Sequence, residues 1–401
     1  MVPGSGPDVS SSGGVDPFGF DAIDPAWVRA KHSAKWSRYP GQLAAWVADM
    51  DMPPAQPILD AIRATADRAD FGYPEWKGTG FGSPAVDVFA ERALRRYGWA
   101  IDHEQLREFC DVVQAVQAVM YVATAPGDGV VLHMPSYPPL WQMIDSMQRR
   151  LIDVPATVTA DGVLFDYDAL EQRLEREPAK VLMLCHPHNP TGHRFDRPEL
   201  ERLAAIAERF DLLIISDEIH ADLTLKPAVH LPIAALSTEV ATRTVTVHSA
   251  SKPFNIAGLR HAIAQIGPQS IRDALDALPN HLLGALNIVA AEASIAAWTL
   301  GDEWLDALLV HIDRNRHLLA SLLAEHLPAV HYLMPDATYL AWLDCRDCGF
   351  SDEPFEVFAS RGVQLNPGLD FGPVGAGHVR LNMATSASML TDIVVTMATP
   401  R

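Results

Sequence analysis

The sequence predicts an α/β protein with a mostly parallel sheet covered by helices, followed by a smaller α+β domain. Short, continuous apolar runs alternate with amphipathic stretches through the middle of the chain. Strands that are apolar on both faces are typical of a parallel sheet with helices on either side. After about Leu283 the pattern changes to a long helical segment and then to separated strands, which indicates a second unit of another class.

The chain before the sheet divides into two parts. Residues 1–17 are rich in Gly, Ser and Pro, a composition that predicts a disordered lead. Residues 18–48 carry spaced aromatic residues, and we expect them to form an N-terminal arm that lies with the small domain. We therefore expect a large domain over residues 49–284 and a small C-terminal domain over residues 285–401.

Each expected element rests on a local signal. A short apolar run predicts a strand, a 3.6-residue period predicts a helix, and proline in the first turn marks a helix start. The elements expected in the large domain are a helix from about 112 to 123, a strand 130–134, a helix 138–147, a strand 181–185, a helix 198–210, and strands 212–215 and 243–248. Those expected in the small domain are a long helical segment 285–309 running on to about 327, a strand 337–343, a helix 354–360, and strands 363–365 and 378–382.

Composition argues against several classes of partner. The formal net charge is −19, so neither nucleic acid nor an anionic membrane surface is expected to bind. No apolar run is long enough to span a bilayer, and the first residues lack the pattern of a secretory signal. Four cysteines are too few for a disulfide scaffold, and a cytoplasmic protein fits best.

Polar residues stand where the predicted strands end. Tyr137, Asn189, Asp217 and Lys252 each follow a different apolar run. Ligands of parallel sheets bind at the carboxyl ends of the strands, so we expect these four side chains to meet in one site.

Lys252 lies in Ser249-Ala250-Ser251-Lys252, directly after a strand. Lysine amines form Schiff bases with carbonyl compounds, including pyridoxal phosphate. Most lysines lie on the surface. Here the small hydroxyl neighbours and the preceding apolar strand favour an amine that is fixed in a site and takes part in its chemistry.

Asp217 closes an apolar run and needs a partner, because burying a lone carboxylate is costly. A protonated pyridine nitrogen is a suitable partner, since the ion pair keeps the ring an electron sink. The alternative is a helix N-cap. The turn that begins at Asn189 can direct an amide at a ring oxygen, and Tyr137 can stack on the ring or serve only in packing. A histidine-based metal site beside this turn is not expected, because further ligands at a recognisable spacing are absent.

A phosphate cup is expected at the start of the helix near residue 112. Val113 and Gln114 stand at that helix start, where free amides bind anions. Ser249, Ser251 and Arg260 complete the cup from the other side. Arg380 is a candidate for a substrate carboxylate, which a guanidinium binds bidentately, or for a structural salt bridge.

Taken together, these residues resemble the fold-type I pyridoxal-phosphate enzymes of the aspartate aminotransferase superfamily. Within it the chain looks most like the MalY/PatB class of cystathionine β-lyases, or C–S lyases, from about Asp24 to Thr385. The motifs that carry the resemblance are Trp46-Val47-Ala48-Asp49-Met50-Asp51, Phe71-Gly72-Tyr73, Asn189-Pro190-Thr191-Gly192, Asp217-Glu218-Ile219-His220, Ser251-Lys252-Pro253-Phe254-Asn255, Asn366-Pro367-Gly368 and Arg380.

The resemblance implies a large domain with a mostly parallel seven-stranded sheet, pyridoxal 5′-phosphate as cofactor and no metal. It implies that Lys252 forms the Schiff base, that Asp217 pairs with the pyridine nitrogen and that Asn189 donates to the ring oxygen. Tyr137 and His220 would contact the ring. Arg380, Tyr73 and Asp49 would meet the substrate, with Tyr73 reaching across the interface of a homodimer into the partner's site.

The chain departs from this class at the cup. Asp111 stands where glycine is usual, and Gln114 replaces the usual proline. An acid beside a phosphate would repel it unless the carboxylate points away.

The expected reaction is β-elimination. Lys252 would remove the Cα proton of L-cystathionine or another cysteine S-conjugate, a thiol would leave from Cβ, and pyruvate and ammonia would follow. An aminotransferase on the same scaffold is the first alternative, and a non-catalytic regulatory or binding protein is the second.

Overall fold

The structure, a computed structural model, describes residues 16–76, 82–159, 162–279 and 281–399. Most of the predicted disordered lead (residues 1–15) and residues 77–81 therefore lie outside the described residues. Asp16, at the end of that lead, accepts hydrogen bonds from the backbone N–H groups of Phe20 and Asp21.

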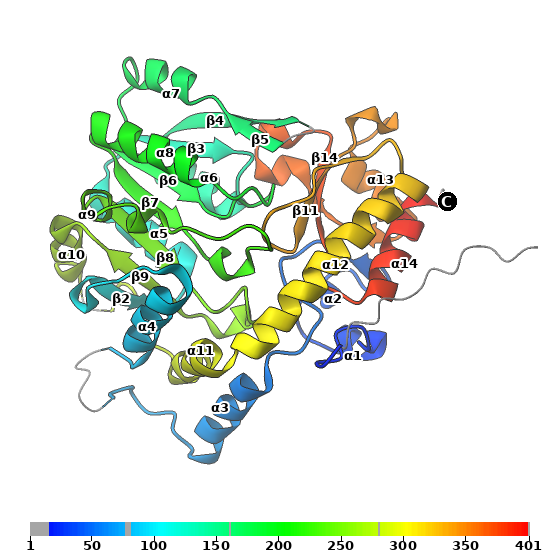
Figure 1. Ribbon diagram of the computed structural model, residues 1–401, viewed down its shortest axis with the longest axis horizontal. Helices are drawn as coiled ribbons and strands as arrows, with labels where there is room; N and C mark the ends of the chain where they lie inside the picture. The colour runs from blue at the N-terminus through cyan, green and yellow to red at the C-terminus, as the bar shows by residue number, and fades with distance from the viewer. Residues whose placement is uncertain (1–15, 77–81, 160–161, 280, 400–401) are drawn as a thin grey trace, which may run out of the picture.

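The main sheet has the strand order β2-β9-β8-β7-β6-β3-β4-β5 (Figure 1). Strands β8, β7, β6, β3 and β4 run parallel, whereas β2, β9 and β5 pair antiparallel with their neighbours. The predicted mostly parallel sheet is confirmed, but among the described residues it has eight strands rather than seven. The extra strand arises because β4 runs past the end of β3, and the backbone groups of residues 156–159 are satisfied by pairing with β5.

The bounds of the strands and helices follow. The strands are β1 Leu43–Ala44, β2 Leu106–Phe109, β3 Gly129–Met134, β4 Arg150–Thr159, β5 Gly162–Phe165, β6 Val181–Cys185, β7 Leu213–Asp217, β8 Thr244–His248, β9 Ala262–Ile266, β10 His331–Tyr332, β11 Leu340–Asp344, β12 Val363–Gln364, β13 Asn366–Pro367 and β14 His378–Asn382. The helices are α1 Pro25–Arg29, α2 Ala34–Ser37, α3 Gln56–Asp67, α4 Ala85–Tyr97, α5 Val112–Ala123, α6 Pro138–Ser146, α7 Tyr167–Leu174, α8 Arg197–Arg209, α9 Thr238–Ala241, α10 Gln269–Asp276, α11 Ile288–Leu300, α12 Asp302–His326, α13 Pro354–Arg361 and α14 Ala387–Ala398.

The strands are apolar throughout because both faces of the sheet are covered. In β6, Val181 and Met183 belong to the core that α5, α6 and α10 form, whereas Leu182 and Leu184 belong to the core under α7 and α8. This arrangement leaves only the strand ends for polar side chains.

The C-terminal part contains a four-stranded sheet, β10-β11-β14-β13, and the long helix α12, which lies beside α14 (Figure 1). The prediction of one long helical segment is wrong at Gly301, where α11 ends and α12 begins. A Cβ on Gly301 would lie 2.5 Å from Phe254 Cε1 and from the Ala297 oxygen. This close packing needs glycine, the residue that also favours a helix least after proline. No helix in the described ranges is long and apolar enough to cross a membrane.

The N-terminal arm is fixed to the rest of the fold by a buried ion pair. Strand β1 pairs with β12, and Lys35 Nζ lies 3.0 Å from Asp51 Oδ1 with both side chains 1% exposed. Trp36 Nε1 donates to the same carboxylate at 2.7 Å, and Lys35 also donates to the Asp49 oxygen. These contacts hold the segment around Asp49 and Asp51, which follows β1, in a fixed position against helix α2.

Replacing Lys35 by methionine is expected to lower the free energy of unfolding by about 3 kcal/mol or more, because Asp51 would stay buried with its charge uncompensated. Denaturant unfolding measures the difference. The matched control is Arg63→Met, which breaks the exposed pair with Asp60 and should change stability by less than about 1 kcal/mol. Equal effects of the two substitutions would contradict the role of the buried pair.

Candidate active site

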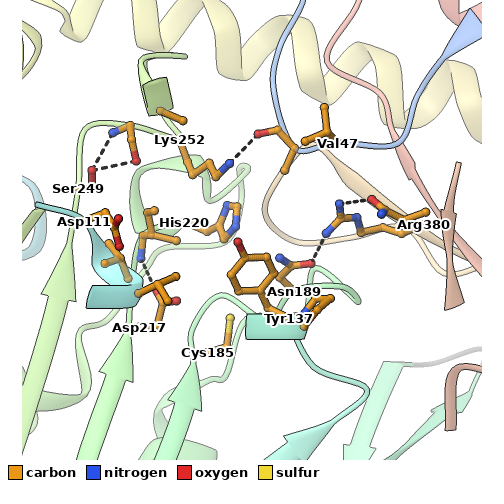
Figure 2. A pocket seen from close by; sticks show the side chains of 18 of the residues that line it. Val47, Asp111, Tyr137, Cys185, Asn189, Asp217, His220, Ser249, Lys252 and Arg380 are labelled. Carbon is orange, nitrogen blue, oxygen red and sulfur yellow. Dashed lines mark hydrogen bonds between the residues drawn. The ribbon is translucent and has the colours of Figure 1, made fainter. Parts of the chain in front are cut away.

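The parallel strands β8, β7, β6 and β3 end at one edge of the sheet, and a cavity of about 250 Å³ lies there. Figure 2 shows Asp111 and Arg380 on opposite sides of it, with Tyr137 and His220 between them. The predicted site residues that line the cavity are Val113, Tyr137, Asn189, Asp217, His220, Ser249, Ser251, Lys252, Arg260 and Arg380. The expectation that polar residues after separate strands converge is thus confirmed.

Lys252 follows β8, and its amine lines the cavity instead of facing solvent. Its Nζ donates to the Ala48 oxygen at 2.7 Å (Figure 2). Burial lowers the pKa of this amine, and the positive charge of Arg380 lowers it further against the opposing effect of Asp49. A lowered pKa leaves more of the amine neutral, which is the form that attacks a carbonyl carbon.

The carbonyl that holds this amine is itself positioned by distant residues. Tyr339 Oη donates to the same Ala48 oxygen at 2.9 Å. Asn255, with φ +57°, accepts from the Met50 N–H and donates to the Met50 and Met52 oxygens. The loop that carries Lys252 therefore clamps the segment that covers it.

Asp217 is the last residue of β7 and is 3% exposed. Its Oδ1 accepts from the Ile219 N–H at 3.1 Å, but no α-helix starts there, so the N-cap alternative is not what the structure shows. Burial raises the pKa of this carboxyl to about 6, and the hydrogen bond from the Ile219 N–H opposes the shift. A buried carboxylate of this kind is stabilised by a cation, such as a protonated pyridine nitrogen.

Asn189 and Arg380 are joined at the other side of the cavity. Arg380 Nη1 donates to Asn189 Oδ1 at 3.0 Å, and Nη2 donates to the Trp46 oxygen at 3.0 Å and to Asn366 Oδ1. Its Nε has no hydrogen-bond partner, and burial lowers the pKa of the guanidinium to about 10. No carboxylate in the described ranges forms an ion pair with Arg380, so it remains available to an anionic group of a substrate.

The turn after Asn189 needs glycine at its end. Gly192 has φ +70°, and a Cβ there would lie 2.2 Å from Pro335 Cβ and 2.8 Å from the Ala337 oxygen. The turn therefore packs directly against the segment before β11 and presents Asn189 to the cavity.

Replacing Arg380 by lysine is expected to raise KM for an amino-acid substrate by about 10- to 100-fold, because a lysine cannot reproduce bidentate bonds to a carboxylate. Steady-state kinetics of product release measure the change. Arg346→Lys, at an exposed pair with Asp344, should leave KM unaltered. An unchanged KM in Arg380→Lys would refute the carboxylate role.

Tyr137 and His220 both line the cavity and lie near its centre in the view of Figure 2. Burial raises the pKa of the Tyr137 hydroxyl, so it stays protonated. Burial, together with the charges of Lys252 and Arg380, lowers the pKa of His220 to about 3. Its imidazole is therefore neutral at pH 7, and its Nδ1 has no protein partner.

Most of the residues expected in the phosphate cup line the cavity near the start of α5. Val113 lines the cavity there, and Ser249 Oγ donates to the His261 oxygen at 2.6 Å and accepts from the Ser251 N–H. Gln114, by contrast, does not line the cavity. Its side chain donates to the Leu283 oxygen and accepts from the Cys110 N–H, while its own N–H is taken by Asp111.

Two further predicted residues lie outside the cavity wall. Tyr73 is fully exposed on the segment after α3. Its side chain is therefore not part of the cavity wall of its own chain. The backbone oxygen of Asp49 accepts hydrogen bonds from Lys35 and Asn382. Its carboxylate affects Lys252 by electrostatic interaction, which raises the pKa of the amine. Contact of either residue with substrate stays a prediction.

The structure also brings to the cavity residues for which the sequence predicted no role in the site. Cys185, at the end of β6, forms part of the cavity floor, and His261 lies beside the cup. Asn366 and Phe371 close the cavity around Arg380, with the Phe371 ring centroid 4.8 Å from the guanidinium carbon. Asn366 and Phe371 had a signal in the sequence, since they stand in the family-like motifs Asn366-Pro367-Gly368 and Phe371-Gly372.

The histidines beside Asn189 are bonded to other groups. His186 Nε2 contacts the Leu231 oxygen, His188 Nδ1 contacts Thr191 Oγ1, and His193 Nε2 contacts Glu199. Within the part of the chain that the structure describes, no group of three His, Cys, Asp or Glu side chains is arranged to hold a metal ion.

Comparison with known proteins supports the same class of site. Residues 50–396 match the family model of aminotransferase class I and II. Cystathionine beta-lyase PatB of Bacillus subtilis is 35% identical, over 87% of this chain and 90% of that protein. Protein MalY of Escherichia coli is 32% identical, over 86% of this chain and 87% of that protein. A pyridoxal-phosphate-bound C–S lyase from Staphylococcus hominis has a TM-score of 0.86 at 27% identity and covers 94% of this chain and 97% of that one.

Fold and site together define a pyridoxal-phosphate enzyme of fold type I. The chain belongs to the aminotransferase class I and II family. The cavity suits the cofactor, since it offers a partly buried amine at Lys252, a buried carboxylate at Asp217 and a helix start with Arg260 for the phosphate.

Proposed function

We propose that the protein is a C–S β-lyase that converts L-cystathionine or another cysteine S-conjugate to a thiol, pyruvate and ammonia. The observation that carries the proposal is the meeting of Lys252, Asp217 and Arg380 in one cavity. The names of the Bacillus subtilis and Staphylococcus hominis relatives point to the same reaction.

Pyridoxal 5′-phosphate, when bound, supplies an electron sink for the pair of electrons left on Cα. Asp217 would hold a proton at the pyridine nitrogen, which would keep that sink effective. Asn189 would donate to a ring oxygen, and Tyr137 would cover the ring face. Lys252 would hold the cofactor, and its amine would be the base that takes the Cα proton of the substrate.

Substrate orientation depends on Arg380, whose guanidinium would hold the α-carboxylate. With Lys252 and Arg260 committed to the cofactor, no further Lys or Arg among the described lining residues is left for a second carboxylate. Because dicarboxylic keto acids and L-cystathionine both carry a second carboxylate, this lining favours a cysteine S-conjugate that lacks one. A thiolate leaves readily from Cβ because the pKa of a thiol is only about 8.5.

The test is incubation of the holoenzyme with L-cystathionine and a panel of cysteine S-conjugates. Release of pyruvate without any keto-acid acceptor supports the lyase. Strict dependence on 2-oxoglutarate would instead show an aminotransferase. Bound cofactor with no turnover of any amino acid would indicate a binding or regulatory protein.

The proposed active unit is a cytoplasmic homodimer in which Tyr73 enters the partner's site. Phe71 and Tyr73 are 66% and 102% exposed, and large apolar side chains exposed side by side favour a protein interface. Tyr73→Ala would then impair catalysis in a dimer that still forms.

A further inference from the structure

The cup at the start of α5 already holds an anion of the protein itself. Asp111 is the N-cap of α5, and its Oδ1 accepts from the Gln114 N–H at 2.8 Å. Its Oδ2 lies 2.7 Å from Arg260 Nη1. Asp111, Ser249 and Arg260 line the same end of the cavity, and Figure 2 shows Asp111 on the side of Ser249 and opposite Arg380.

The carboxylate uses the two kinds of group that a phosphate would need there. One is an N–H at a helix start and the other is a guanidinium. The side chains are 28% and 66% exposed for Asp111 and Arg260, so the pair is weakly held and can open. A phosphate that enters the cup meets the negative charge of Asp111 at close range.

We propose that Asp111 sets the affinity for the cofactor. In the cofactor-free protein its carboxylate binds Arg260, the same group that the phosphate would bind. This ion pair must break when the cofactor binds. The carboxylate keeps Arg260 and the start of α5 in place without cofactor. The consequence is weaker and more readily exchanged binding of any phosphate-bearing cofactor. This inference rests on the cofactor site and is independent of which reaction the enzyme performs.

The test compares two ligands in the cofactor-free protein. Pyridoxal 5′-phosphate and pyridoxal both condense with a lysine amine, but only the first carries the phosphate. Asp111→Asn keeps an N-cap acceptor, since Asn caps as well as Asp, and removes the charge. Absorbance titration is expected to show binding of pyridoxal 5′-phosphate that is about tenfold tighter or more in Asp111→Asn, with binding of pyridoxal unchanged.

The matched control is Asp166→Asn, at the N-cap of α7, where the carboxylate accepts from the Ala169 N–H at 2.9 Å and does not line the cavity. It should alter neither affinity. As a second readout, inorganic phosphate should raise the thermal midpoint of cofactor-free Asp111→Asn more than that of the unsubstituted protein. Unchanged or weaker binding of the phosphorylated cofactor in Asp111→Asn would overturn the proposal, as would an equal gain for pyridoxal. Because both readouts are equilibria, a failure of the lyase assay would not affect them.

Discussion

Lys252→Ala is expected to lose turnover, with kcat lowered by at least about 10²- to 10⁴-fold from the missing proton transfer alone. The amine that is held on the Ala48 oxygen at 2.7 Å lines the same cavity as Arg380 and is the proposed base. The variant should still bind the cofactor, since the phosphate cup and Asp217 are untouched. Pyruvate release and absorbance titration measure the two effects separately.

Borohydride reduction gives an independent check on the same residue. In the unsubstituted holoenzyme the reduced cofactor should stay attached to the peptide that contains Lys252, and in Lys252→Ala no label should remain. Lys180→Ala, an exposed lysine after α7, is the control and should keep both label and activity. Label on another peptide, or near-full activity of Lys252→Ala, would remove the basis of the proposed function.

Asp217→Asn is expected to have the second largest effect, a fall in kcat of about 100-fold or more, because an amide cannot keep the pyridine nitrogen charged. The amide oxygen can still accept from the Ile219 N–H, so the local turn should persist. The loss should appear in kcat more than in KM, since Asp217 does not contact the substrate.

The same substitution is expected to stabilise the cofactor-free protein. The pKa of Asp217 is raised from 3.8 to about 6 by burial, so the folded protein favours the protonated carboxyl. The stability that this group contributes is fully present below the unfolded pKa near 4 and is lost as pH rises through about 6. Above that pH the buried ionised carboxylate lowers the free energy of unfolding by about 3 kcal/mol at most. The neutral amide introduced by Asp217→Asn carries no such penalty.

Denaturant unfolding of cofactor-free protein at pH 8 and pH 5 tests this. Asp217→Asn should exceed the unsubstituted protein in stability at pH 8, and the difference should shrink at pH 5. Asp168→Asn, at a side chain that is 85% exposed, should show no such pH-dependent gain. If Asp217→Asn were less stable at both pH values, Asp217 would already be compensated by another group.

Much of the site could be predicted because its residues are fixed by local sequence. Tyr137, Asn189, Asp217 and Lys252 each stand a few positions after or at the end of an apolar strand. Parallel strands in one sheet end at the same edge, so these side chains had to meet once the strands were identified. The helix start at Val112 was predictable from the local pattern of a turn entering a helix.

The direction in which individual side chains turn could not be predicted. Gln114 was expected in the cup, yet its amide reaches the Leu283 oxygen, a partner far away in the sequence. Nothing local indicated that Asn255 clamps the backbone near Met50. The break at Gly301 also depends on a distant contact, the ring of Phe254.

The sequence by itself indicated the class of fold, the cofactor, and the lysine and aspartate that are predicted to serve it, because hydrophobic period and strand-end chemistry are local properties. Only the tertiary structure decided that Asp111 turns into the cup and pairs with Arg260, and that Arg380 is held by Asn189, Trp46 and Asn366 without a carboxylate. Those outcomes depend on charges and hydrogen-bond partners brought together by long-range packing, which a residue's neighbours in the chain do not specify.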